Sequence, residues 1–391
     1  MADRTDDRII ALVARSDGLT RIALQAELGL PAATVTSAVG RLLARGVLVE
    51  APDPTRRSKS GRRPALLRVA GRRPLIGVVS WNRDHVRTAL ASFAGDVVAA
   101  TEHPAHGGDV LAAPMASLTE PTDGRLSAVV VSVPAPYQRG KGVPSFRRSG
   151  PPRAEPDRPR WLAAFDSDPA STWSERLGVP VVFENDANLA LIGEASAGVA
   201  AGLHDVVYVK LNGYSAGSGL LVGGQVHRGA NGFAGELAHL HVDDDGPLCA
   251  CGGRGCLQTR LGPSLMDSVH NAFGTPVTFT DILRLAEAGE HGPSRILGEI
   301  GRTIGRPLAD LVTFLNPAAI VVDGSLGPAA RFVVDGLREP IDRYASPTAA
   351  SHLRVLVGTL GPRADLFGAI ALTRGEALQG APFLAAVGAH P

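Results

Sequence analysis

The sequence predicts an α/β protein that begins with a small unit of helices and two strands. From residue 75 onward, apolar strand-like runs alternate with helix-like segments, which is typical of an α/β architecture. Before residue 75, three short amphipathic segments separated by glycines are followed by two short apolar runs. At roughly 150 residues per domain, the 391 residues suggest two to three domains.

Composition is that of a globular chain. Hydrophobic residues make up 45% and charged residues 20%, which disfavours a disordered tail, a collagen-like fibre and a coiled coil. No apolar run approaches the ~18 residues that a membrane span needs. The polar start, Met1 to Arg8, leads into no apolar signal-peptide core. We therefore expect a cytoplasmic chain that does not contact a membrane.

Residues 1–70 have the pattern of a winged helix–turn–helix. A first helix is expected over residues 8–15. Thr20 is suited to cap a second helix, which Gly29 would stop. Pro31 stands at a tolerated first-turn position of a third helix that ends at Gly46. Three short helices with a tight glycine-containing turn before the third make this motif.

Two strands and a loop complete the predicted head. The strands are expected at 47–50 and 65–69, and the loop between them, 51–64, is rich in proline, serine and arginine. This loop would be the wing, and residues 71–74 would be the linker to the body.

Charge is distributed unevenly between head and body. Residues 1–74 carry 14 arginines and lysines against 7 acidic residues, a net charge of +7, whereas the whole chain has a net charge of +1. A basic head on an acidic body is the distribution expected of a DNA-binding domain fused to another domain. In such a head, the start of the third helix enters the major groove and the wing contacts phosphates or the minor groove. The candidate DNA-binding residues are Thr34, Thr36, Ser37, Arg41, Arg62 and Arg63.

Two alternatives stay open for the head. The basic excess can be a chance accumulation of arginine on a solvated face, because the chain uses arginine throughout and has lysine only at 59, 141 and 210. The helix–turn–helix can also serve protein contacts alone.

Four potential metal ligands lie close together in the body. They follow the pattern H-x9-C-x-C-x4-C and are His239, Cys249, Cys251 and Cys256. One imidazole and three thiolates satisfy tetrahedral Zn²⁺ with no open position, so a structural zinc site is expected. His241 is a rival ligand two residues away. The alternative is three reduced cysteines in a glycine-rich loop.

A polar pentapeptide, Glu184-Asn185-Asp186-Ala187-Asn188, follows an apolar strand expected at 179–183 and opens a helix expected at 187–197. Asn and Asp side chains can bind sugar hydroxyls. Asp186 can also act as a general base that accepts a hydroxyl proton during phosphoryl transfer. The plainer alternative is that Asp186 only caps the following helix.

Together with the winged head, this pentapeptide, the segment from Arg228 to His239 and Cys256-Leu257-Gln258 resemble the ROK family of repressors, open reading frames and sugar kinases. The resemblance implies an actin-like, ribonuclease-H-like two-lobed sugar-kinase-type body that binds a sugar between its lobes and forms a homodimer or homotetramer. The lobes would be 75–185, joined by a C-terminal helix over 364–391, and 186–363, which carries the zinc loop. The implied sugar-binding residues are Asn185, Asp186, Glu236, His239 and Gln258, the last in place of the family's usual glutamate.

The same resemblance exposes three departures in the nucleotide-binding elements. The first phosphate loop of the family's kinases is of the D-x-G-G-T type, but residues 77–84 have no glycine pair and no aspartate at the strand end. The second, at 212–219, lacks the first part of the pattern, and the adenosine segment at 322–327 lacks the usual Gly-Gly turn. We therefore expect that ATP binding is lost and that Asp186 is only the vestige of a general base.

The leading hypothesis is a sugar-responsive transcriptional regulator, a repressor that binds a palindromic operator. An ATP-dependent sugar kinase that also carries a head is one alternative. A regulator without any small-molecule ligand, whose body serves only assembly, is the other.

Overall fold

The computed structural model describes most of the chain. The described residues are 2–14, 18–44, 47–52, 65–69, 75–81, 85–105, 110–119, 122, 126–143, 160–165, 167–212, 215–249, 251–261, 265, 269–271, 273–274 and 277–374. Most of the expected wing with Arg62 and Arg63, the linker 71–74 and the end of the chain from 375 lie outside these residues.

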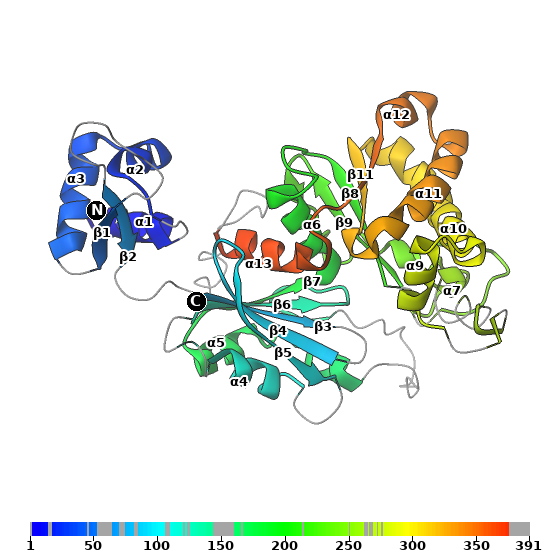
Figure 1. Ribbon diagram of the computed structural model, residues 1–391, viewed down its shortest axis with the longest axis horizontal. Coiled ribbons are helices and arrows are strands. Elements are labelled where there is room, and N and C mark those ends of the chain that lie inside the picture. Colours follow the sequence, from blue (N-terminus) through cyan, green and yellow to red (C-terminus); the bar gives the residue numbers. More distant parts are fainter. Residues whose placement is uncertain are drawn as a thin grey trace.

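The N-terminal unit has the predicted three helices and strand pair (Figure 1). They are α1 (Ala2–Ala14), α2 (Arg21–Leu28), α3 (Ala32–Ala44), β1 (Leu48–Pro52) and β2 (Ala65–Val69). The hydroxyl of Thr20 accepts a hydrogen bond from the amide of Ala23, and Gly29 ends α2 with a left-handed φ of 62°. Both predicted helix boundaries are thus confirmed. Apolar side chains from all three helices and both strands form one small core.

The body contains two sheets with the same strand arrangement. The first has the order β5 (Val97–Pro104), β4 (His85–Ser92), β3 (Leu75–Trp81), β6 (Leu126–Val133) and β7 (Val181–Asn185). The second has the order β10 (Gln225–Val226), β9 (Ala216–Val222), β8 (Val206–Leu211), β11 (Ala319–Val322) and β12 (Arg354–Val357). In each sheet two antiparallel pairings are followed by two parallel pairings.

Helices cover both sheets and also lie between them. α4 (Ala112–Thr119) and α5 (Ala170–Leu177) pack on the outer face of the first sheet. α9 (Phe279–Glu287), α10 (His291–Leu315) and α11 (Ala330–Tyr344) pack on the outer face of the second. The shorter elements are η2 (Arg160–Phe165), η3 (Leu237–His239), α7 (Gln258–Leu261), η4 (Gly324–Ala329), α12 (Pro347–His352) and η5 (Gly361–Arg363). None of the described helices combines the length and apolar character needed to cross a bilayer.

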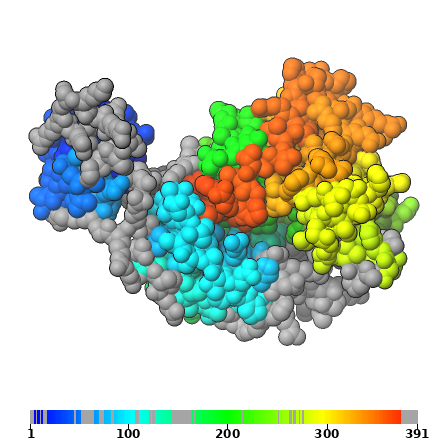
Figure 2. All heavy atoms as spheres, viewed as in Figure 1, coloured from blue at the N-terminus to red at the C-terminus, as the bar shows by residue number. Residues whose placement is uncertain are grey.

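Two helices form a central layer shared by both sheets. Apolar side chains of α6 (Asp186–Ala197) and α13 (Ala364–Arg374) belong to one core with Ile76 and Val78 of β3 and with Val206 and Val321 of the second sheet. In Figure 2 the orange-red atoms of α13 lie between the cyan atoms of the first sheet and the green and orange atoms of the second half. The lobe boundaries expected between 185 and 186 and between 363 and 364 stay a prediction. Side chains of α6 and α13 pack against both sheets, so these two helices belong to both halves of the body.

Two elements differ clearly from their predicted bounds. The first helix, expected at 8–15, begins six residues earlier, at Ala2. The strand expected at 179–183 runs from Val181 to Asn185, because Pro180 has no amide hydrogen for the ladder and Val181 is the first residue that pairs with β6. α9 and α10 follow each other closely but are separate helices, and Gly289 between them has a φ of 91°.

Close packing of α6 against α13 requires glycine at the contact. A Cβ added at Gly368 would lie well inside contact distance of the carbonyl oxygen of Leu189. We expect Gly368→Ala to lower the free energy of unfolding by about 1–3 kcal/mol, because neither helix backbone can move away. Gly298→Ala is the matched control: Gly298 is a buried helical glycine whose added Cβ would find its nearest atom at 3.7 Å. Urea unfolding of both variants tests this, and equal stabilities would contradict it.

Candidate functional site

Asn185 and Asp186 lie at the junction of β7 and α6, between the two sheets. The side-chain oxygen of Asn185 accepts hydrogen bonds from the amides of Ala187 and Asn188, both at 3.0 Å, and its amide donates to the carbonyl of Ala135 at 3.0 Å. Asn185 is therefore the N-cap of α6. The alternative that Asp186 caps this helix is wrong. Asp186 is the first helical residue, and its carboxylate is 18% exposed.

Glu184, just before this pair, is a buried carboxylate held by two arginines. Its Oε2 lies 2.8 Å from Arg139 and 2.8 Å from Arg228, and its Oε1 accepts from the side-chain amide of Asn188 at 3.2 Å. Burial alone would raise the pKa of Glu184, but the positive charges of Arg228 and Arg139 outweigh burial and lower the pKa to about 2. The carboxylate thus stays ionised and fixes both arginines beside Asn185.

The segment from Arg228 to His239 folds back against the same region. Arg228 anchors its start to Glu184. Farther along, Gly235 lies directly against the backbone of Ser218 in β9, which leaves no room for a side chain. Burial, together with the negative charge of Asp186, raises the pKa of Glu236 to about 8. Glu236 and Asp186 are therefore electrostatic neighbours, as the predicted sugar-binding set requires.

Four potential metal ligands come together in the loop after η3. One ligand atom from each of His239, Cys249, Cys251 and Cys256 lies within 4.8 Å of the others. The Nδ1 of His239 is 3.6 Å from Sγ of Cys249, and Sγ of Cys251 is 3.6 Å from Sγ of Cys256. A pocket of one imidazole and three thiols at these separations fits a tetrahedral metal ion of the size and softness of Zn²⁺.

The two remaining residues near this loop behave differently. His241 lies outside the cluster, with a side chain that is 54% exposed and an Nε2 3.5 Å from Asp244, so the rival ligand does not join the other four. Gln258 begins α7 two residues after Cys256 and is half-buried. Its role as a sugar contact stays a prediction.

The predicted DNA-binding residues that the structure describes lie on α3. Thr34, Thr36 and Ser37 are exposed, whereas Val35 between them is buried in the head core. Arg41 is also exposed, but its guanidinium lies 2.6 Å from the carboxylate of Asp6 in α1. Arg41 therefore also ties α1 to α3.

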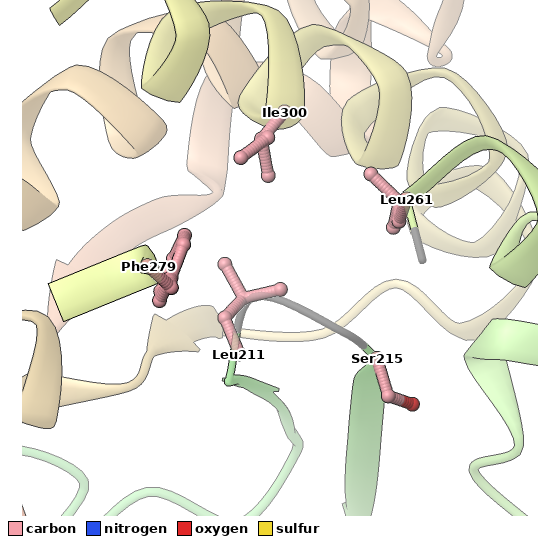
Figure 3. Close-up of a pocket in the computed structure, with 5 residues that line it drawn as sticks. All are labelled: Leu211, Ser215, Leu261, Phe279 and Ile300. Atoms are coloured by element: carbon pink, nitrogen blue, oxygen red, sulfur yellow. The ribbon is translucent and has the colours of Figure 1, made fainter. Parts of the chain in front are cut away.

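Apolar side chains fill or line two of the segments that correspond to nucleotide-binding elements. Trp81 ends β3 and is only 8% exposed, because its ring packs edge-on against Phe165 with centroids 5.4 Å apart. A hollow of about 220 Å³ lies beyond the β8–β9 turn (Figure 3). It is lined by Leu211, Ser215, Leu261, Phe279 and Ile300. One hydroxyl among four apolar side chains lacks the convergent polar groups that bind a sugar.

Sequence reasoning missed the charged partners of this site. Lys210 of β8 lies 3.3 Å from the carboxylate of Asp186 and 3.1 Å from that of Asp365 in α13. Arg139 was likewise not predicted to reach Glu184. Lys210 is one of three lysines in an arginine-rich chain, a signal that could have singled it out.

We expect Glu184 to contribute acid-dependent stability. Its pKa is depressed in the folded chain, so its contribution is complete above about pH 4.5, the ordinary value, and is lost as the pH falls toward 2. Glu184→Gln leaves two arginines without their carboxylate and should lower the free energy of unfolding at pH 7 by about 3–5 kcal/mol. The difference from the wild-type chain should shrink between pH 4.5 and pH 2, as measured by urea unfolding. Glu175→Gln, at an exposed position of α5, should show no such dependence.

The sequence is similar to those of proteins named as xylose repressors and glucokinases. A putative xylose repressor from Caldicellulosiruptor is 26% identical over 362 residues, which covers 88% of this chain and 89% of that protein. A glucokinase from Streptomyces coelicolor is 33% identical over 225 residues, which covers 51% of this chain and 68% of that protein. The chain spans about half the length of the Bacillus xylose repressors it matches.

A solved structure has a similar fold over nearly the whole chain. It is a ROK family transcriptional regulator, a homologue of the E. coli MLC protein, and it covers 98% of each chain with a TM-score of 0.73 at 20% identity. The winged head and the sugar-kinase-type body are thus parts of a known architecture. The ROK family model matches residues 154–376, and the chain belongs to the ROK family.

Proposed function

We propose that this chain is a transcriptional repressor of sugar-metabolism genes that responds to a sugar held in its body and acts in the cytoplasm. The observation that carries the proposal is the joining of two modules in one chain. A head with an exposed row of hydroxyl side chains on α3 precedes a body with polar groups gathered at the start of α6. The relatives named xylose repressors support the same function.

The DNA-binding surface we propose consists of α3 and the wing. Thr34, Thr36 and Ser37 would approach the major groove, where small hydroxylated side chains let the backbone come close to base edges. Arg41, Arg62 and Arg63 would contact phosphates or the minor groove. Two heads of a homodimer or homotetramer would then read a palindromic operator.

The sugar site we propose consists of Asn185, Asp186, Glu236, His239 and Gln258. Amide, carboxylate and imidazole groups offer the donors and acceptors that sugar hydroxyls need. We propose no phosphoryl transfer here, because residues 77–84, 212–219 and 322–327 lack the glycine patterns of the family's nucleotide-binding elements. The glucokinase relatives make a sugar kinase the alternative that the experiments below must exclude.

Zinc is the metal that we propose for the cluster of His239 and the three cysteines. Four ligands leave no open coordination position, so the ion would be structural. It would hold the loop that follows Glu236 and would fix the imidazole of His239 beside the sugar.

The function is tested by measuring operator and sugar binding separately in two variants. Ser37→Glu places a negative charge on the proposed DNA face and should reduce operator affinity at least tenfold at fixed salt, while sugar still raises the unfolding temperature. Glu236→Ala should show the reverse: operator binding persists and the sugar response is lost. Ser351→Glu, an exposed serine of α12, is the charge-matched control for the first variant.

The screen begins with xylose and then covers other pentoses, hexoses and N-acetylhexosamines. Transfer of phosphate from ATP to any of them, together with no affinity for duplex DNA at modest ionic strength, would overturn the proposal. A chain that binds its operator but responds to no sugar would favour a ligand-independent regulator.

Removal of zinc should lower both the unfolding temperature of the chain and its affinity for sugar. We expect the purified chain to contain about one zinc per chain, and Cys256→Ser to contain much less, because removing one thiolate from four ligands weakens tetrahedral binding. A chelator should lower the unfolding temperature of the wild-type chain and its sugar affinity. Metal analysis and thermal unfolding measure both effects. A wild-type chain without metal that still binds sugar at full affinity would contradict the assignment.

A further inference from the structure

Lys210 lies where charged groups from both halves of the body meet. Its ammonium is 3.3 Å from Oδ2 of Asp186, and 3.1 Å and 3.4 Å from the two carboxylate oxygens of Asp365. The side chains of Lys210, Asp186 and Asp365 are 23%, 18% and 19% exposed. This is a half-buried ion cluster that solvent still reaches.

The cluster joins a strand of each sheet to the two helices that lie between the sheets. Asp186 begins α6, Asp365 lies in the first turn of α13, and Lys210 belongs to β8 of the second sheet. Ser132 of β6, in the first sheet, donates a hydrogen bond to Oδ2 of Asp365 at 2.9 Å. Asp323, which follows β11, is 3% exposed, and its charge also acts on Lys210.

One ammonium therefore pairs directly with two carboxylates, those of Asp186 and Asp365. Burial opposes the charged form of Lys210, but Asp186, Asp365 and Asp323 outweigh burial and raise the pKa of Lys210 above its usual range. Without a cation, the carboxylates of Asp186 and Asp365 would repel each other in a partly dry region. Carboxylate and hydroxyl oxygens are also the ligands that Mg²⁺ prefers.

We propose that Lys210 is a built-in counter-cation that takes the place a divalent ion would otherwise fill between Asp186 and Asp365. The chain itself then supplies the charge that a magnesium–nucleotide would bring to a phosphoryl-transfer site. Lys210 thereby excludes a metal–nucleotide from this region and keeps the two halves of the body in electrostatic contact without one.

The consequence for Asp186 rests on the proposed function. A carboxylate already paired with an ammonium is a hydrogen-bond acceptor for a sugar hydroxyl. Burial and the charge of Asp365 raise the pKa of Asp186, and the charge of Lys210 opposes that rise. Lys210 is in this view a positioning residue that makes Asp186 a sensor of the sugar.

A simpler reading makes Lys210 only a clamp between α6 and α13. The two readings differ in what can replace the side chain. A clamp needs a side chain that spans both helices, whereas a counter-cation can be replaced by a free divalent ion once the side chain is shortened.

The test uses thermal unfolding of the full chain, with no sugar and no DNA, so its result is independent of the proposed function. Lys210→Ser should unfold several degrees below the wild-type chain in Mg²⁺-free buffer, and Mg²⁺ should restore much of this loss in a saturable manner by mass action. Lys210→Arg keeps the charge, and neither it nor the wild-type chain should respond. Mg²⁺ is the probe because thiolates bind it poorly, so the cysteine cluster does not contribute.

A double variant locates the effect. Lys210→Ser combined with Asp365→Asn removes one of the repelling carboxylates, so it should be more stable than Lys210→Ser in Mg²⁺-free buffer and should lose the Mg²⁺ response. If Lys210→Ser does not fold without Mg²⁺, recovery of folding by the double variant supports the proposal and its absence overturns it. A folded Lys210→Ser chain that ignores Mg²⁺ also overturns it, as does a wild-type chain that Mg²⁺ stabilises equally.

Discussion

The contact between α6 and α13 is the constraint on which the body depends. Each helix packs against both sheets, and at Gly368 the two backbones approach too closely for a side chain. Their N-terminal turns carry Asp186 and Asp365, so the packing that joins the halves also brings two carboxylates to one ammonium. The fold and the charge arrangement of the site therefore have the same origin, and a change in the tilt of either helix would alter both.

Local chemistry made the head and the metal cluster predictable. The hydroxyl of Thr20 and the left-handed Gly29 act on their nearest neighbours in sequence, and the four metal ligands lie within 18 residues of one another. The features that were missed depend on distant residues. Lys210 and Asp365 are 155 positions apart, and Arg139 and Glu184 are 45 apart, so periodicity and spacing carry no information about either pair. α11 also went unpredicted: it contains Pro340, which ordinarily argues against a helix interior.

The edge strand β5 illustrates a different limit. Most of its residues are exposed, so it lacks the alternation of buried and exposed side chains by which a strand is recognised in a sequence. Its pairing with β4 is fixed instead by the short turn between them, where Ser92 and Asp96 hydrogen-bond through backbone and side chain. The turn and the pairing with β4, rather than the pattern of the strand's own residues, decide its structure.

The position of the site within the first sheet bears on how a sugar would reach the head. Asn185 ends β7, β7 pairs with β6, and β6 pairs with β3, which is the first described strand after the head. Two strand spacings, about 10 Å, thus separate β7 from β3. Because these strands are parallel, Asn185 lies at the opposite end of the sheet from Leu75, the first residue of β3. In the proposed function, a sugar that contacts Asp186 would act on α6 and, through β7 and β6, on the hydrogen-bonded sheet that contains β3. A coupling of about 1–3 kcal/mol would be sufficient for such a regulator, and the ion cluster around Lys210 is the charged contact between the halves that a sugar at Asp186 would meet.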